Sequence, residues 1–320
     1  MTEDIASRIA GLRGQEAIDL SGLALSALPE SIGGLAAAES LDLDRNQLTA
    51  LPDGLGRLGK LKSLSLYHNQ LTTVPESLWR LARLEILNLA DNRFASLSEG
   101  LGSLINLRML DLGHNQLQAL PESLGNLRRL RFLYASNNRL MSVPEALQNL
   151  HELIYLNITD NGLADLPAGL GNLANLIELR LYNNQIAALP EAIGNLTALR
   201  EMHLMNNRLV SLPAPIGSLH NLRKLDLEGN RLSALPDSIE DLVGLTDLNL
   251  RSNQLGSLPE SVGALKQLRF LDLRANRLTS LPASLGRLTR LEKLDLRWNK
   301  ISPLPPWISD LERRGCTVFT

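Results

Sequence analysis

The 320-residue sequence is poor in the features that mark secreted, nucleic-acid-binding and membrane-spanning proteins. Its single cysteine, Cys316, argues against a disulfide-stabilised extracellular protein, so we expect a reducing compartment. The net charge of −2 provides no general attraction to nucleic acid or to an anionic membrane surface. Polar or charged residues interrupt every apolar run well before a membrane-spanning length. The first residues, MTEDIASRIAGLRG, lack the basic and apolar regions of a secretion signal, and we therefore expect a cytoplasmic protein.

Asparagine, by contrast, recurs every 23 residues without one insertion or deletion. Leucine-like residues hold fixed positions around each asparagine, and a unit reads L-x-x-L-x-L-x-x-N-x-L-x-x-L-P-x-x-L-G-x-L-x-x. A unit of this length cannot bury its apolar face alone, so successive units must stack. The repeated asparagines are Asn46, Asn69, Asn92, Asn115, Asn138, Asn161, Asn184, Asn207, Asn230, Asn253, Asn276 and Asn299.

This pattern resembles that of the leucine-rich repeat proteins, and its 23-residue length with a recurring Leu-Pro resembles their intracellular Ras-group, Shoc2-like class. The resemblance covers thirteen units over residues 15–313, with Leu23 in place of the asparagine in the first unit. It implies an α/β solenoid with a curved parallel sheet on the concave face and short helical or 3₁₀ segments on the convex face. The class shares a scaffold and not an activity. The excess of arginine over lysine further indicates a GC-rich, bacterial genome.

The residues outside the repeats predict one element at each end of the solenoid. Ile5, Ile9 and Leu12 share one face of an amphipathic helix within residues 1–14, which would cover the open end of the first repeat. Residues 314–320 predict a closing strand that protects the last sheet edge, with the repeat phase shifted there by about one residue. Within each repeat, we expect the asparagine amide to satisfy backbone groups at the bend. We also expect the proline to precede a short helix.

Motifs that would support catalysis or cofactor binding are explained by the repeat. The pattern G-x-G-x-x-G occurs at Gly54, Gly56 and Gly59, but Gly56 is simply the glycine that recurs at this position of most repeats. His68 and His114 occupy equivalent positions two repeats apart. That separation is about 10 Å, which is too wide for one zinc ion. We therefore predict no enzyme activity, no cofactor and no metal site.

The outward-facing strand positions differ from repeat to repeat and are the candidates for function. The central repeats place apolar and aromatic side chains there, including all four tyrosines of a chain with only 3% aromatic residues. Exposed apolar patches mark interaction sites, and tyrosine and methionine are enriched in interfaces. The alternative is that these side chains merely favour strands. The predicted patch comprises Tyr67, Ile86, Met109, Phe132, Tyr134, Tyr155, Tyr182, His203 and Met205.

Charged residues flank this patch in the sequence. On its N-terminal side, we interpret an acidic group as ordinary solvated surface. It comprises Asp19, Asp42 and Asp44. On its C-terminal side, an arginine column alternates with aspartates, so it is either a binding surface or a lattice of charges that neutralise one another. The column comprises Arg251, Arg274 and Arg297, with Trp298 beside it.

These observations predict a non-enzymatic scaffold for protein–protein interaction, for example in cytoplasmic signal transduction. A partner protein would lie across the concave face, anchored by the central aromatic residues and oriented by the arginine column. We expect a monomer with no nucleic-acid or membrane partner. The alternative is a bacterial effector-type leucine-rich repeat protein that is delivered into a host cell and acts on a host protein. The identity of the partner stays open.

Overall fold

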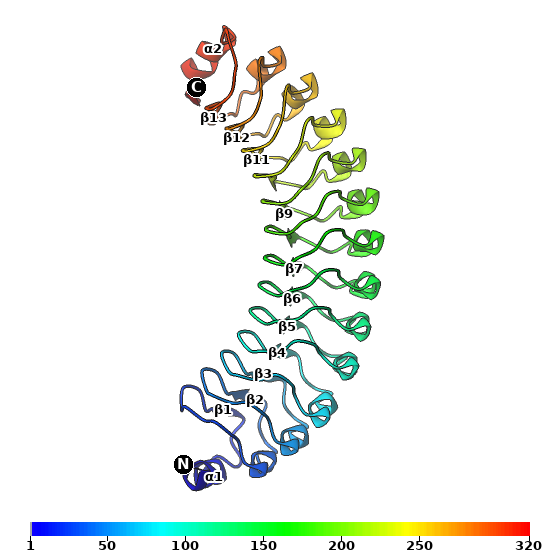
Figure 1. Cartoon of the computed structure of the whole chain (residues 1–320), viewed down its shortest axis with the longest axis vertical. Helices are drawn as coiled ribbons and strands as arrows, with labels where there is room; N and C mark the ends of the chain where they lie inside the picture. Colours follow the sequence, from blue (N-terminus) through cyan, green and yellow to red (C-terminus); the bar gives the residue numbers. More distant parts are fainter. Residues whose placement is uncertain (1) are drawn as a thin grey trace. The chain divides into compact units, whose positions relative to one another are not determined.

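The computed structural model describes residues 2–320, and the chain divides into two compact units, residues 1–161 and residues 162–320. Each unit is a stack of repeats in which a three-residue strand and a five-residue 3₁₀ helix alternate. Within each unit, the strands lie along the inner, concave side and the 3₁₀ helices along the outer, convex side (Figure 1). The strands pair in parallel with those of the next repeat. The predicted solenoid is therefore confirmed.

The first unit begins with helix α1 (Thr2–Gly11), followed by seven strands and six 3₁₀ helices. Its strands are β1 (Ala17–Asp19), β2 (Ser40–Asp42), β3 (Ser63–Ser65), β4 (Ile86–Asn88), β5 (Met109–Asp111), β6 (Phe132–Tyr134) and β7 (Tyr155–Asn157). Its 3₁₀ helices are η1 (Glu30–Gly34), η2 (Asp53–Arg57), η3 (Glu76–Arg80), η4 (Glu99–Ser103), η5 (Glu122–Asn126) and η6 (Glu145–Asn149).

The second unit has the same plan and contains helix α2 (Trp307–Arg313) before its last strand. Its strands are β8 (Glu178–Arg180), β9 (Glu201–His203), β10 (Lys224–Asp226), β11 (Asp247–Asn249), β12 (Phe270–Asp272), β13 (Lys293–Asp295) and β14 (Thr317–Phe319). Its 3₁₀ helices are η7 (Ala168–Asn172), η8 (Glu191–Asn195), η9 (Ala214–Ser218), η10 (Asp237–Asp241), η11 (Glu260–Ala264) and η12 (Ala283–Arg287).

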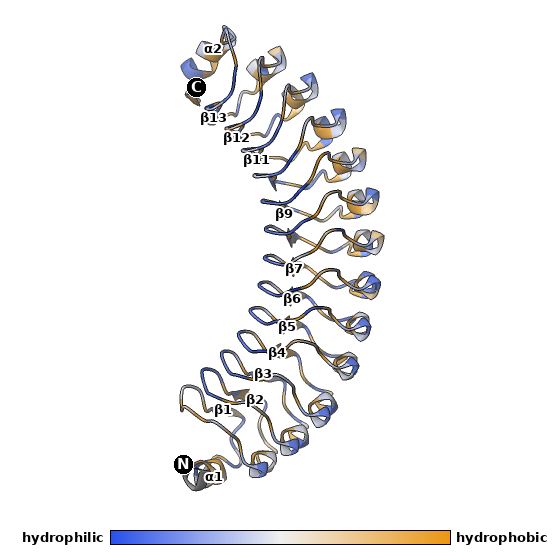
Figure 2. Ribbon diagram, viewed as in Figure 1, coloured by the Kyte–Doolittle hydropathy of each residue, from blue (hydrophilic) through white to orange (hydrophobic). Residues whose placement is uncertain are grey.

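Leucine side chains fill the interior of each repeat. Because side chains alternate along a strand, Leu110 and Leu112 point inward and are fully buried, whereas Asp111 points outward and is half-buried. Figure 2 shows apolar segments linking the strand side to the helix side of the repeats, with hydrophilic residues on the bends. The core is thus a continuous row of leucines within each unit, and the outward strand positions are left for other purposes.

The repeated asparagines form an internal hydrogen-bonded ladder, as the sequence predicts. The Asn115 carbonyl oxygen accepts the Phe94 N–H from the preceding repeat at 3.1 Å, and its amide nitrogen donates to the Leu89 carbonyl at 3.0 Å. The same arrangement recurs at Asn161, which accepts the Leu140 N–H at 2.9 Å. Most of these asparagines are buried, whereas Asn138, Asn161 and Asn299 are half-buried. The ladder therefore ties the bend of each repeat to the one before it.

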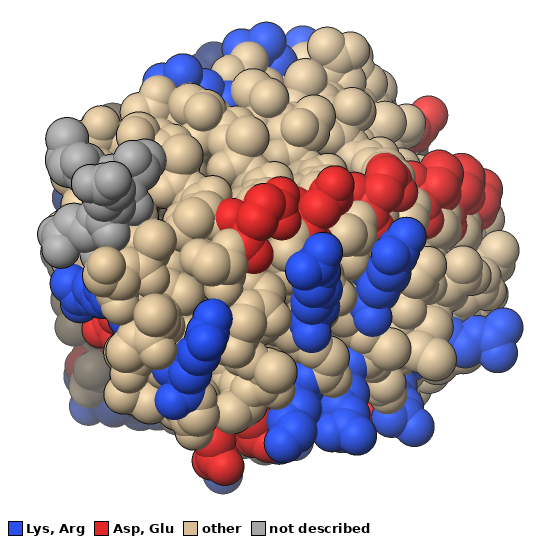
Figure 3. Space-filling view, turned by 90° about the horizontal axis from the view of Figure 1, so that it is seen from below, with Lys and Arg blue, Asp and Glu red and all other residues tan. Residues whose placement is uncertain are grey.

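The convex side is held by close backbone packing. Proline precedes the 3₁₀ helices as predicted, and where Ser98 replaces it, the serine hydroxyl accepts the Gly100 N–H. A Cβ atom on Gly56 would lie 2.3 Å from the Ser77 carbonyl oxygen, so only glycine lets η2 and η3 approach so closely. Figure 3, seen from the N-terminal end, shows a row of acidic side chains with lysine and arginine side chains nearby.

Acidic residues that follow the proline act across repeats. The Glu99 carboxylate accepts the N–H groups of Glu122 and Ser123, at 3.3 and 2.8 Å, from the first turn of η5. The bond from the Ser123 backbone holds the pKa of Glu99 below its ordinary value. Glu30 and Glu260 make equivalent bonds to the next 3₁₀ helix. Each of these carboxylates therefore caps the 3₁₀ helix of the following repeat.

The ends of the chain carry the two extra elements. Helix α1 packs against η1, with Ile5 and Ile9 buried. Strand β14 pairs with β13 in a register that places Thr317 opposite Lys293, one residue beyond the 23-residue spacing. Helix α2 is an α-helix where the other repeats have a 3₁₀ helix. Among residues 2–320, none of the helices is long and apolar enough to cross a membrane.

Candidate functional site

The outward column that lies four residues before each ladder asparagine is largely structural. The Asp111 Oδ1 atom accepts the Gly113 N–H at 2.9 Å, two residues further along the chain. This local bond is typical of aspartate and asparagine at turns. The same bond is made by Asp19, Asp42, Asn88, Asn157, Asp226, Asn249, Asp272 and Asp295. Asp19 and Asp42 of the acidic group therefore support the backbone. The third member, Asp44, accepts the Tyr67 N–H at 2.8 Å.

A second outward column, immediately before each ladder asparagine, is constrained by its backbone. Its residues have φ angles near +50 to +70°, a left-handed conformation that asparagine, aspartate and histidine adopt more readily than most residues. This preference accounts for His68 and His114, and His68 also pairs with Asp91 at 2.5 Å. Trp298 is the exception, because a bulky side chain with φ of 63° is rare. It is also 64% exposed.

The column that lies six residues before the asparagine forms an apolar surface in the first unit. Ile86 lies opposite Met109, Met109 opposite Phe132, and Phe132 opposite Tyr155 on neighbouring strands. Tyr134 replaces the usual aspartate beside this column. Its ring centroid lies 4.9 Å from that of Tyr155, with the planes tilted by 38°. The structure thus brings five of the predicted patch residues together on β4 to β7.

The other predicted patch residues lie elsewhere. Tyr67 contacts the ring of His68 and lines a separate hollow with Arg45 and Gln47. In the second unit, Tyr182 and Met205 are half-exposed and occupy equivalent positions in consecutive repeats. His203 is only 7% exposed, because its ring lies against the strand surface beside Glu201 and Glu178. It therefore adds no apolar surface.

The arginine column forms ion pairs with neighbouring carboxylates. Arg297 Nη2 lies 2.6 Å from the Asp295 Oδ2 atom, and Arg274 Nε lies 3.4 Å from the same atom. Arg251 pairs with Glu228 at 3.4 Å. Burial raises the pKa of Asp295, but the bonds from Arg297 and the charges of both arginines outweigh it, so the pKa is lowered overall. This geometry matches the self-neutralising alternative.

Aromatic residues cluster near these arginines at the C-terminal end of the second unit. The Arg297 guanidinium lies 4.8 Å from the Phe319 ring and 5.7 Å from the Trp298 ring, within cation–π range. A hollow of about 240 Å³ lies on strands β10 to β13. Its lining includes Lys224, Asp247, Phe270 and Lys293. This end of the surface is therefore mixed in charge, unlike the apolar surface of the first unit.

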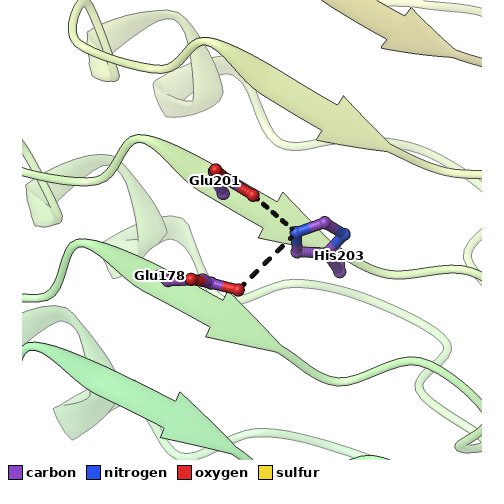
Figure 4. A group of neighbouring side chains, drawn as sticks. All are labelled: Glu178, Glu201 and His203. Carbon is purple, nitrogen blue, oxygen red and sulfur yellow. Dashed lines mark hydrogen bonds and ion pairs between the residues drawn. The ribbon is translucent and has the colours of Figure 1, made fainter.

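Sequence reasoning missed a cluster in the second unit that consists of Glu178, Glu201 and His203 (Figure 4). One nitrogen or oxygen atom from each side chain lies within 4.8 Å of the others. The signal was present in the spacing. Residues 23 apart occupy neighbouring strands, and residues two apart on a strand share a face. Combining the two periods places Glu201 beside Glu178, and His203 next to both.

Family profiles match most of the chain. The profile described as "Leucine rich repeat" matches residues 36–94, 82–140 and 245–301, and a second of nearly the same description matches 221–242. A "Leucine-rich repeat region" profile matches residues 144–227. A search of curated protein sequences found no significant match.

Solved structures with the same fold come from bacteria and plants. A leucine-rich repeat protein of Leptospira interrogans is 35% identical with a TM-score of 0.86, over 92% of this chain and 76% of that one. The internalin inlF of Listeria monocytogenes is 26% identical, with a TM-score of 0.82, over 98% and 88%. The plant peptide hormone receptor RGFR1, solved in complex with RGF2, is 29% identical with a TM-score of 0.77, over 92% and 53%. The chain belongs to the leucine-rich repeat family.

Proposed function

We propose that this chain is a non-enzymatic scaffold that binds a protein partner on its concave strand surface. Leucine-rich repeats commonly serve as scaffolds for protein interaction, and the structure of the peptide hormone receptor RGFR1 was solved in complex with RGF2. The observation that carries the proposal is the apolar surface of β4 to β7. Ile86, Met109, Phe132 and Tyr155 occupy consecutive strands, and Tyr134 packs on Tyr155, so the surface is continuous across four repeats.

Tyr134 and Tyr155 are the centre of this surface. Tyr134 occupies a position where most repeats use aspartate or asparagine to support the backbone. Its ring packs on Tyr155, so both side chains are already ordered and lose little further entropy when a partner binds. Tyrosine is also among the residues that dominate binding energy near the centre of interfaces.

The arginine column has a secondary role in the proposal. Its guanidinium groups are held by Asp272, Asp295 and Glu228, so they do not supply a large net charge. Charges at the rim of an interface act mainly on encounter and orientation. We therefore assign the affinity to the tyrosine pair and only a minor effect on the encounter with the partner to the arginine column.

The test is the double variant Tyr134→Ala/Tyr155→Ala, with Ile105→Ala/Met141→Ala as the matched control. Ile105 and Met141 are 57% and 62% exposed and lie outside the strands, so the control also removes two apolar side chains. Proteins captured from source cells would be quantified for both variants, and the best candidate would be purified for calorimetry. We expect each tyrosine to contribute about 2 kcal/mol or more to binding. Full affinity in the tyrosine variant, with an unchanged circular dichroism spectrum, would contradict the proposal.

The alternative function is an effector that acts on a host protein. Its support is the likeness to bacterial leucine-rich repeat proteins, including an internalin. A reporter enzyme fused to the first few dozen residues would measure delivery into host cells. Delivery would favour the effector function, and its absence in secretion-competent cells would count against it.

A further inference from the structure

We propose that Glu178, Glu201 and His203 form a binding site for a divalent transition-metal ion, with Zn²⁺ as the best-suited ion. The three side chains come from β8 and β9 in the second unit and point toward one another (Figure 4). The His203 Nε2 atom lies 3.1 Å from Glu201 Oε2 and 3.9 Å from Glu178 Oε1. The proposal departs from the sequence prediction of no metal site, and it does not depend on the protein-binding function.

The spacing of these atoms suits an ion. Zinc binds nitrogen and oxygen atoms at about 2 Å, so neighbouring ligands around a tetrahedral ion lie about 3.3 Å apart. The separations of 3.1 and 3.9 Å bracket this value, and all three ligand atoms lie within 4.8 Å of one another. Imidazole together with carboxylates is a ligand set that suits zinc and related ions better than calcium or magnesium.

The local charge also favours a cation. Glu178 and Glu201 lie directly opposite each other on parallel neighbouring strands, where like charges destabilise a sheet. Arg180 Nε lies 2.5 Å from Glu178 Oε1 and offsets part of this charge while fixing the orientation of that carboxylate. Hydrogen bonds that orient ligating carboxylates are a regular feature of metal sites. An ion between the two carboxylates would relieve their remaining repulsion.

The sequence at these strand positions differs from that of other repeats. His203 and Arg180 stand in the column where most repeats carry an aspartate or asparagine that bonds to its own backbone. His203 is nevertheless held in a fixed position, because its side chain is only 9% exposed. The Glu201 side chain is 44% exposed, so the site is open on one side. Three protein ligands with one open position is the arrangement of zinc sites that accept a further ligand.

The same three side chains could form an ordinary ion-pair cluster in which a charged imidazolium offsets the carboxylates. Calorimetric titration of the whole, metal-stripped chain with zinc chloride separates the two possibilities. The variants are His203→Gln and Glu201→Gln, which keep side-chain size similar. The matched control is His68→Gln, because His68 pairs with a single carboxylate, Asp91, on the surface of the first unit. Cys316→Ser serves as a second control for the one thiol.

We expect the wild type and both controls to bind one equivalent of Zn²⁺. His203→Gln and Glu201→Gln should weaken binding at least about 100-fold, since loss of even an orienting partner costs 10- to 100-fold. Substitution with Co²⁺ should also give visible absorption in the wild type that is absent from His203→Gln. Lack of stoichiometric binding by the wild type would overturn the proposal, whether or not the variants fold. So would zinc binding that survives in His203→Gln or disappears in a control.

Discussion

Replacing Asn115 with alanine should destabilise the fold through one backbone group. The Asn115 side chain bonds to the carbonyl groups of Leu89, Leu112 and Gly113 and to the N–H of Phe94. All three carbonyls keep another donor without it. These donors are the Asn92 amide, the Asn138 amide and the Asp91 N–H. Only the Phe94 N–H, in a residue that is 1% exposed, is left unpaired.

The magnitude follows from that single unpaired donor. A buried polar group that loses its partner costs about 1–3 kcal/mol, whereas an acceptor that keeps a second donor loses much less. We therefore expect Asn115→Ala to lower the free energy of unfolding by about 1–3 kcal/mol. Asn161→Ala leaves the Leu140 N–H unpaired in the same way, but Asn161 is half-buried and water can replace part of its bonding. Its loss should be smaller.

A third variant tests the direction of the bonds. Asn115→Asp keeps an oxygen for the Phe94 N–H but removes the NH₂ donor and places a negative charge beside three carbonyl oxygens. We expect this variant to be less stable than Asn115→Ala at neutral pH, although it is closer in shape to the wild type.

Urea unfolding followed by circular dichroism would measure all three variants under one condition. A loss of less than about 0.5 kcal/mol in Asn115→Ala would contradict an unpaired Phe94 N–H, because a buried donor without a partner costs more than that. A larger loss in Asn161→Ala than in Asn115→Ala, or wild-type stability in Asn115→Asp, would contradict this account of the ladder.

Two further pairs of variants test other columns. The pKa of Asp295 is lowered in the folded state, so the ionised carboxylate stabilises the fold above the unfolded-state pKa. This stabilisation is lost as pH falls through the folded-state pKa. Asp295→Asn should therefore cost about 2 kcal/mol at pH 7 and little in acid, measured from urea midpoints between pH 3 and 8. Burial raises the pKa of Asp111, so the contribution of this carboxyl to folding stability is present below the unfolded-state pKa and is lost as pH rises through the folded-state value. Asp111→Asn should therefore be neutral or stabilising at pH 7. A loss of stability like that of Asp295→Asn would contradict this account. Gly56→Ala should lower the thermal midpoint because its Cβ would clash with Ser77, whereas Gly59→Ala, with nothing within 4 Å of the added atom, should be close to neutral; equal shifts would refute the close-packing argument.

The fold could be predicted from the sequence because one period determines it. Residues 23 positions apart occupy equivalent places in successive repeats, and the alternation of Leu110 and Leu112 with polar residues indicates which face of the strand is buried. The α-helical form of α2 could not be predicted in the same way, because Ile308 and Leu311 still hold the apolar positions of the repeat and the pattern is lost only after Leu311. Secondary structure can be predicted where successive repeats make the same contacts, and the prediction is weaker where the repeat pattern ends.

The candidate site was predictable only in part. The column that carries Met109 and Phe132 was visible as a run of apolar residues in an aromatic-poor chain. The backbone role of Asp111 was not visible, because an acceptor for the Gly113 N–H depends on the turn geometry. The near-complete burial of His203 likewise depends on which neighbours its ring meets on adjacent strands. Residue types on the surface can be listed from sequence, but their partners across strands require the register.

The outward columns differ in how much they contribute to the backbone structure, and this difference determines how such a chain can change its binding specificity. Replacing Asp111 by a residue without a side-chain acceptor removes a turn bond, and a replacement of His68 must suit a left-handed backbone, so both positions carry a stability penalty. The side chains of Met109 and Phe132 in the neighbouring column are apolar, so their replacement removes no turn bond of this kind. New side chains can be sampled there one repeat at a time without loss of a turn bond, provided that like charges do not face each other on neighbouring strands. A repeat protein built this way carries its evolvable positions in a single line, spaced one strand apart.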